Sequence, residues 1–164
     1  MMYKNVKLLP SEIRKMKQIF PDIDNLIADD EGLEYKEYRI SIFSQCLTRE
    51  ESNKLLDNIP KNIERIRTVK LQRFILSLCK EFDAYLIMYN KEKKTFEYKQ
   101  VISEDDIKLS HSMVPNWNRV KLVIPSIKAI YFENCDFTHL LYFKNDKILS
   151  RFKYLVKKKG LNII

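Results

Sequence analysis

The longest regular pattern in the sequence is an apolar periodicity between Asn62 and Phe82. Apolar side chains recur there at intervals of three and four residues, as they do along one face of an α-helix. Pro60 precedes the pattern, and the fixed φ angle of proline suits the first position of a helix. We therefore expect the central helix of the fold here. Its apolar residues are Ile63, Ile66, Leu71, Phe74, Ile75, Leu78 and Phe82.

Segments with the character of β-strands lie on both sides of this helix. Tyr35 to Ser44 alternates in side-chain type, and the polar stretch Asn90 to Lys94 joins two β-like runs as a hairpin connection does. Pro125 and Ser126 separate two further aliphatic runs. The strands expected after the central helix are Ala84 to Tyr89, Thr95 to Val101, Val120 to Ile124, Ile127 to Phe132, His139 to Phe143 and, as a short strand or tail, Leu161 to Ile164.

Other helices are indicated by residues that favour helix ends. Thr48 and Glu51 match a capping box, in which the hydroxyl and the carboxylate each accept a hydrogen bond from an exposed backbone N–H group. Asn145 or Asp146 suits the start of a last helix, and Gly160 suits the left-handed residue that ends it. These signals and the apolar spacing predict helices over Ser11 to Phe20, Asp22 to Asp30, Thr48 to Asn58, Ser103 onward and Lys147 to Lys159.

The order of these elements predicts an α+β fold. Helices and strands are interspersed without the regular alternation of a parallel sheet, so we expect a mixed or antiparallel sheet with packed helices. The chain has 164 residues, the usual size of one domain, and contains no internal repeat, low-complexity tract or linker. We therefore expect residues 1–164 to form a single domain.

The scarcity of glycine and histidine excludes several kinds of active site. Gly32 and Gly160 are the only glycines, and phosphate-binding loops need glycine where backbone N–H groups approach the phosphate. His111 and His139 are the only histidines, and the cysteines have no close spacing. We therefore expect no cofactor, no metal and no disulfide framework.

One cluster, Cys135, Asp136 and His139, has the residue types of a catalytic nucleophile, acid and base. Nothing near it supplies an oxyanion hole, and a turn into a strand need not bring the three side chains together. We expect instead a buried Cys135 and a His139 at the surface. The cysteines Cys46, Cys79 and Cys135 are expected to be reduced and mostly buried. The sequence is interpreted as that of a non-enzyme.

The expected location is the cytoplasm. No run of about 18 to 20 apolar residues is present, because charged side chains such as Arg73 and Lys121 interrupt the apolar stretches. The first residues lack the apolar block of a signal peptide. We expect a protein that has no membrane partner.

Basic residues are concentrated in two of the expected helices. The formal net charge is +8. Such sets either form a solvated surface matched to the helix dipoles or hold nucleic acid through its phosphates, and both interpretations stay open. The central helix carries Lys61, Arg65, Arg67, Lys70 and Arg73, and the C-terminal set consists of Lys144, Lys147, Arg151, Lys153, Lys157, Lys158 and Lys159.

Acidic residues are concentrated between Asp22 and Glu37, where seven carboxylates accompany a single lysine, Lys36. A basic partner would relieve their mutual repulsion, and so would packing against the basic central helix. Trp117, between two asparagines, suits either an interface anchor or a core position. The residues predicted to bind a partner are Asp22, Asp24, Asp29, Asp30, Glu31, Glu34 and Trp117.

The last quarter of the chain, His139 to Ile163, resembles the closing strand, helix, Gly-Leu pair and strand of small bacterial immunity proteins. Those proteins accompany polymorphic toxins, including the toxins of contact-dependent growth inhibition. The resemblance implies a cytosolic, cofactor-free protein that binds one cognate toxin domain, one to one, and blocks its active site or its access to substrate. The net charge of +8 departs from the many nuclease-neutralising proteins that are acidic. The alternative is a small basic nucleic-acid-binding protein.

Overall fold

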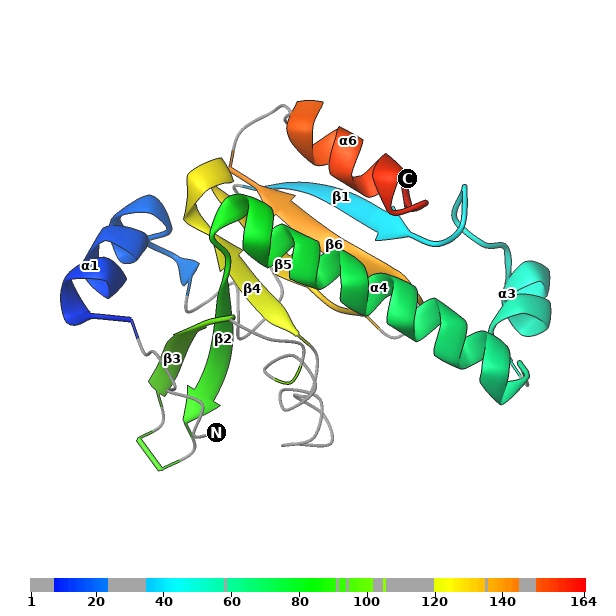
Figure 1. Cartoon of the computed structure of the whole chain (residues 1–164), viewed down its shortest axis with the longest axis horizontal. Helices are drawn as coiled ribbons and strands as arrows, with labels where there is room; N and C mark the ends of the chain where they lie inside the picture. Colours follow the sequence, from blue (N-terminus) through cyan, green and yellow to red (C-terminus); the bar gives the residue numbers. More distant parts are fainter. Residues whose placement is uncertain are drawn as a thin grey trace.

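The fold is α+β and is built around one antiparallel sheet (Figure 1). The computed structural model describes residues 8–23, 35–57, 59–90, 92–93, 95–101, 105, 120–134, 136–144 and 150–164. In these residues the strand order is β3-β2-β4-β5-β6-β1-β7, and every neighbouring pair is antiparallel. The strands are β1 (Lys36–Ser41), β2 (Tyr85–Asn90), β3 (Thr95–Gln100), β4 (Lys121–Ile124), β5 (Ala129–Phe132), β6 (Thr138–Phe143) and β7 (Asn162–Ile163).

Two strands differ from their expected bounds by more than one residue at one end. Pro125–Ile127 forms a turn of 3₁₀-helix between β4 and β5, and Lys128 follows it with a φ of +52°. The expectation that Ile127 belongs to a strand is wrong, because proline offers no N–H group to a strand ladder and the left-handed Lys128 reverses the chain. β1 ends before Ser44 because the Ser41 hydroxyl accepts a hydrogen bond from the Phe43 N–H group at 3.0 Å, which bends the chain.

Two helices cover one face of the sheet. α4 (Lys61–Phe82) runs along this face, and α6 (Ser150–Lys158) lies beside it (Figure 1). The ring of Phe152 on α6 contacts Phe74 of α4 and Phe143 of β6 edge-on. Every third or fourth residue of α4 from Leu71 onward is buried in the same cluster. This face therefore holds the larger part of the core.

The opposite face packs against α1 (Pro10–Ile19) and the residues that follow it. Met16 and Phe20 are buried there with strand residues such as Ile130. The alternation along β5 explains the two cores, because Ile130 points to this side while its neighbours Ala129 and Tyr131 point to α4. The helices therefore enclose the sheet from both sides.

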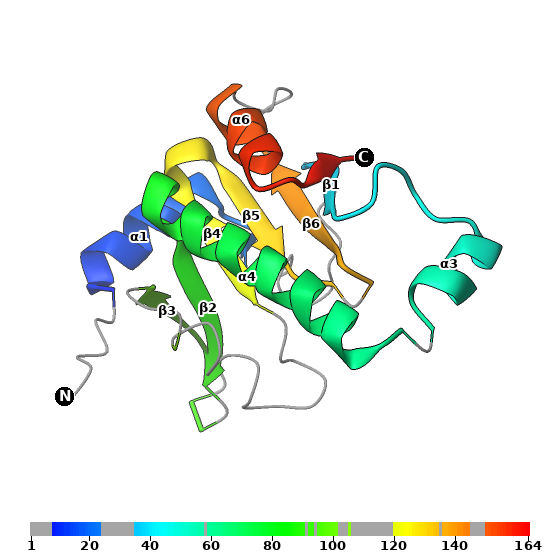
Figure 2. The ribbon, with the colours of Figure 1, turned by 45° about the vertical axis from the view of Figure 1, so that its right-hand side comes forward.

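α3 (Arg49–Leu55) lies beyond the end of the sheet, next to the start of α4 (Figure 2). The capping box is confirmed: the Thr48 hydroxyl accepts from the Glu51 N–H group at 3.2 Å, and the Glu51 carboxylate accepts from the Thr48 N–H group at 2.8 Å. α3 ends at Leu55 rather than near Asn58, and none of its residues is buried. Local capping, rather than core packing, accounts for this helix.

Some expected features fall on other positions or outside the described residues. α4 begins at Lys61, so that Pro60 precedes the helix instead of opening it. Residues 24–34, 102–104, 106–119 and 145–149 are not among those described. The helix expected from Asp22 to Asp30, the one expected from Ser103 and the cap expected at Asn145 or Asp146 lie wholly or mostly there.

Candidate binding groove

The exposed side of α4 carries cations next to aliphatic residues. Arg65, Ile66, Val69, Lys70 and Arg73 recur at spacings of three and four, so they share a face of the helix. The buried side chains, which begin at Leu71, lie on the other side and hold that face against the sheet. The packing of α4 on the sheet therefore orients this set toward solvent.

A second set of cations comes from the end of α6. Lys158 and Lys159 close that helix, and Gly160 ends it with a φ of +66°, as expected. The N–H group of Leu161 donates to the Val156 carbonyl at 3.0 Å, and that of Gly160 donates to the Lys157 carbonyl at 2.9 Å. These two bonds define a Schellman motif, with Leu161 and Val156 both buried beneath it. The motif fixes where the last lysines lie.

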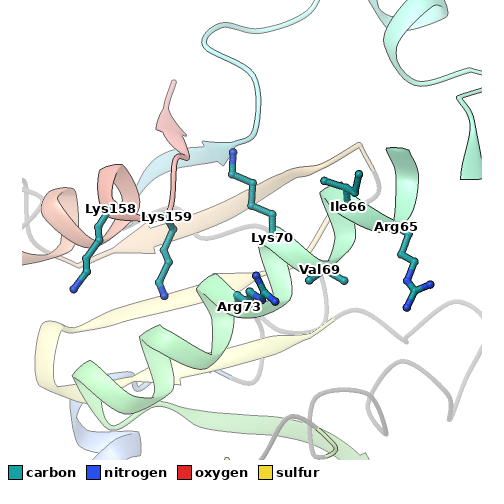
Figure 3. A pocket seen from close by; sticks show the side chains of 7 residues that line it. All are labelled: Arg65, Ile66, Val69, Lys70, Arg73, Lys158 and Lys159. Carbon is teal, nitrogen blue, oxygen red and sulfur yellow. The ribbon is translucent and has the colours of Figure 1, made fainter. Parts of the chain in front are cut away.

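Together the two helices form a groove of about 660 Å³, which we call the basic groove (Figure 3). Lys158 and Lys159 reach from the end of α6 toward α4, and Lys70 reaches from α4 toward the chain after α6 (Figure 3). A volume of this size matches the usual range of ligand pockets. The lining consists of Arg65, Ile66, Val69, Lys70, Arg73, Lys158 and Lys159.

The lining has five cations and no acid. The ion pairs of the described residues lie elsewhere, for example between Arg151 and Glu81 and between Lys54 and Glu50. Within those residues none of the five groove cations has a carboxylate within ion-pair distance. Clustered like charges in a concave surface raise the local concentration of anions, so the groove is suited to binding carboxylates or phosphates.

Lys70 also has a role in the fold. A Cβ atom built on Gly160 would lie 3.2 Å from the Nζ of Lys70, which places the ammonium group at the carbonyl end of α6. A cation is stabilised there by the helix dipole, typically by about 0.3–1 kcal/mol. The same dipole favours Lys158 in the last turn of α6, whereas the exposed Arg65 and Arg73 lie away from a helix C-terminus and need another explanation.

Two basic residues of the predicted sets have structural partners outside the groove. Arg67 donates through Nη1 to the Leu55 carbonyl, and its guanidinium lies 5.4 Å from the ring centroids of both Phe43 and Phe137. Arg151 donates through Nε to Glu81 at 3.1 Å and lies 5.4 Å from the ring of Phe82.

The remaining basic residues are divided between the fold and the surface. Lys144 donates to the Ile19 carbonyl at 3.0 Å. Lys61, Lys153 and Lys157 are exposed, and Lys147 lies outside the described residues. The two sets therefore do not form one continuous basic face.

Asp22 is the one described member of the predicted partner-binding set. Its Oδ1 accepts a hydrogen bond from the Tyr35 hydroxyl at 2.8 Å, which joins the end of α1 to the start of β1. This carboxylate has a role in the fold. The role of the others stays a prediction, because Asp24, Asp29, Asp30, Glu31, Glu34 and Trp117 lie outside the described residues.

His139 is buried, and the expectation of a surface histidine is wrong. Its side chain is 1% exposed, and its Nδ1 forms a hydrogen bond with the hydroxyl of Tyr131. Burial raises the pKa of Tyr131 well above its ordinary value, so the phenol stays protonated. His139 occupies an inward position of β6, two residues before the buried Leu141, and this alternation was the signal in the sequence.

The other members of the nucleophile cluster show no catalytic arrangement among the described residues. Asp136 accepts a hydrogen bond from the Thr138 N–H group at 3.1 Å, as in a turn, and Cys135 lies outside the described residues. Of the two described cysteines, Cys46 is exposed and Cys79 is buried, and both are free thiols. Burial raises the pKa of Cys79 to about 12, which keeps that thiol protonated.

Comparisons with protein-family models, curated proteins and solved structures return no match for this chain. Over the described residues, no three histidine, cysteine or acidic side chains are grouped as a metal site would require. No described helix is long and apolar enough to span a bilayer. The basic groove is therefore the feature of the described surface that carries a functional argument.

Proposed function

We propose that this chain is an immunity-type protein that binds one cognate toxin domain in the cytoplasm through the basic groove and thereby neutralises it. The observation that carries the proposal is the convergence of five cations from α4 and α6 in one groove without an acid in its lining. An acidic surface on the partner would complement that charge. Close charge pairs across an interface contribute about 1.5 kcal/mol or more each.

The chemistry of the lining favours binding over catalysis. Ammonium, guanidinium and aliphatic groups make up the lining, which has no carboxylate, imidazole, thiol or hydroxyl side chain. General acid–base and nucleophilic catalysis most often rely on those four groups, and lysine, which the lining does contain, serves less often. A non-enzymatic inhibitor needs only a complementary surface, and the groove supplies one.

The aliphatic residues of the groove favour a protein partner. Ile66 and Val69 lie among the cations, and an apolar centre within a polar rim is the usual anatomy of a protein–protein interface. Proteins that bind single-stranded nucleic acid stack bases on aromatic rings, and the groove lining has none. An acidic face on the toxin also agrees with the net charge of +8.

Nucleic-acid binding is the second candidate, and Tyr154 is the observation that favours it. This side chain is 65% exposed on α6, and the Nζ of Lys158 lies 5.8 Å from its ring centroid. A basic groove beside an exposed ring resembles the chemistry of a nucleic-acid surface. For five phosphate contacts on duplex DNA, log K would fall with log salt at a slope of about −4 to −5.

Co-expression tests the proposal. The open reading frame immediately upstream of this gene supplies the candidate toxin, whose C-terminal domain is expressed in cells with and without this chain. We expect the domain alone to stop growth, the chain to restore it, and the purified pair to form a 1:1 complex. The proposal is contradicted if the domain alone does not stop growth, or if it does and this chain fails to restore growth. If no complex forms and the chain instead binds a labelled duplex with an affinity that falls steeply with salt concentration, the second candidate is supported.

A further inference from the structure

The first ten residues of α4, Lys61 to Lys70, include no buried residue, whereas six of the twelve from Leu71 to Phe82 are buried. At a rise of 1.5 Å per residue, this unburied half is about 15 Å long. It projects past the sheet toward α3 (Figures 1 and 2). We call residues Lys61 to Lys70 the α4 overhang.

The α4 overhang is only partly covered: Ile63 and the residues from Arg67 to Lys70 are half-buried, and the others are exposed. The neighbouring helix α3 has no buried residue, and Arg67 joins the two by donating to the Leu55 carbonyl. The rings of Phe43 and Phe137 lie beside the same guanidinium. None of its residues is fully buried, so the overhang gains less from tertiary packing, which supplies most helical stability, than the part of α4 from Leu71 to Phe82.

The α4 overhang nevertheless carries aliphatic side chains. Ile63, Ile66 and Val69 recur every three residues, and Ile66 is 63% exposed. Ile66 and Val69 line the basic groove, with Arg65, Lys70 and Arg73 around them. Ile63 and Val69 are already half-buried, whereas the exposed Ile66 gains stability from burial only when another surface covers it.

We infer that the α4 overhang, together with the adjoining Arg73 and Lys158 of the basic groove, is a docking surface for a segment of a protein partner in which an aliphatic side chain is flanked by carboxylates. The aliphatic group covers Ile66 and Val69, and the carboxylates pair with Arg65, Arg73 and Lys158. The partner segment should be acidic because the groove cations would pair with its carboxylates. It should have an apolar centre because the exposed Ile66 would then be covered. This inference rests on the proposed function, because it assumes that the groove receives protein.

Peptide binding tests the inference without the toxin. Three labelled probes are titrated against the full chain at low salt: a nine-residue peptide with one Leu between two runs of four Glu, a nine-residue all-Glu peptide and a 12-base-pair duplex. We expect the Leu peptide to bind about tenfold more tightly than the all-Glu peptide, which corresponds to about 1.4 kcal/mol. Hydrogen exchange should show that the Leu peptide protects the amides of Lys61 to Lys70.

The matched variants are Ile66→Gln and Leu9→Gln, because both side chains are 63% exposed and only Ile66 lines the groove. We expect Ile66→Gln to abolish the preference for the Leu peptide and Leu9→Gln to keep it. Equal affinity for the two peptides, unchanged exchange in the overhang, or tighter binding of the duplex than of either peptide would overturn the inference.

The two proposals fail in distinguishable ways. If the inference alone is wrong, the chain still protects cells from the toxin, and the peptides show no preference for the aliphatic centre. If the proposed function is wrong, protection is absent whatever the peptides show.

Discussion

At the scale of single residues, Gly160 is the position whose backbone most clearly requires its amino acid. Its φ of +66° lies in the left-handed region, which costs an L-residue with a Cβ atom about 1 kcal/mol. A Cβ atom would also approach the Cε of Lys70 to 3.3 Å, although that flexible end moves aside easily. The backbone conformation is therefore the main source of the cost.

We predict that Gly160→Ala lowers the free energy of unfolding by about 1 kcal/mol, measured by urea denaturation. Gly160→Asn should cost less, because asparagine tolerates the left-handed conformation better. Equal losses for the two variants would contradict the backbone explanation. A loss that disappears in a Lys70→Ala background would indicate that crowding of Lys70 is responsible instead.

Cys79 gives a pH dependence whose sign can be stated. Burial raises its pKa from 9.0 to about 12. The unfolded chain therefore releases the thiol proton from about pH 9, while the folded chain keeps it. Fewer protons are then bound in the unfolded state, so stability is fully present below pH 9 and falls as the pH rises toward 12.

We predict that urea denaturation between pH 8 and 10, with a reductant present, shows a decline in stability that Cys79→Ala flattens. The full linkage of one proton corresponds to about 1.4 kcal/mol per pH unit. Cys46→Ala is the control, because it removes a thiol that is exposed rather than buried. If the free energy of unfolding of Cys79→Ala falls with pH as steeply as that of the wild type, the pKa of Cys79 does not differ between the folded and unfolded states.

At the scale of elements, Arg67 holds α3 to the rest of the fold. It contacts the last residue of α3 and two rings from separate loops, and α3 buries nothing of its own. A lysine at this position would keep the positive charge. It would lose the planar guanidinium, which donates a hydrogen bond and lies against the aromatic rings at the same time. Arg67 therefore ties α3 to the rest of the fold, while the Thr48 capping box supports the helix itself.

We predict that Arg67→Lys speeds amide hydrogen exchange in α3 at least about tenfold while exchange from Leu71 to Phe82 changes little. Local opening of a weakly packed element need not involve the core. Arg65→Lys is the control, since Arg65 is exposed and lies on the groove side of the same helix. Unchanged exchange in α3 would show that its capping box is sufficient to hold it.

The elements could largely be predicted because their signals are local. The periodicity before Phe82, the hairpin after Ala84 and the Thr48 capping box each depend on residues close in sequence. Ile127 lies in an aliphatic run typical of a strand, and the left-handed Lys128 that reverses the chain has no signal in its residue type. The polarity of His139 favours the surface, whereas its position in β6 places it inside.

At the scale of the whole molecule, the basic groove could not be predicted, because it joins residues distant in sequence. The sequence indicates both basic helices, but that Arg73 and Lys158 line one groove depends on how α4 and α6 pack on the sheet. The sequence also does not show that Arg67 donates to the Leu55 carbonyl and Arg151 to Glu81, so that neither side chain lines the groove. Which cations line the groove and which bind partners elsewhere is decided by the packing of the helices on the sheet.

The measurement that tests the central claim most directly is calorimetric titration of the toxin domain into variants of this chain. Arg73→Glu with Lys158→Glu reverses two cations of the groove, and Arg14→Glu with Lys15→Glu reverses two exposed cations of α1. Both changes alter the net charge equally, so only the location of the charge differs between them.

We predict that the groove variant weakens binding about a hundredfold, from two lost charge pairs of about 1.5 kcal/mol each, while the chain stays folded. The α1 variant should bind within about threefold of the wild type. Wild-type affinity in the groove variant would contradict the account. Equal loss of affinity in the groove and α1 variants would also contradict it. So would a loss of affinity that occurs only when the charges of Asp29, Asp30 and Glu31 are reversed.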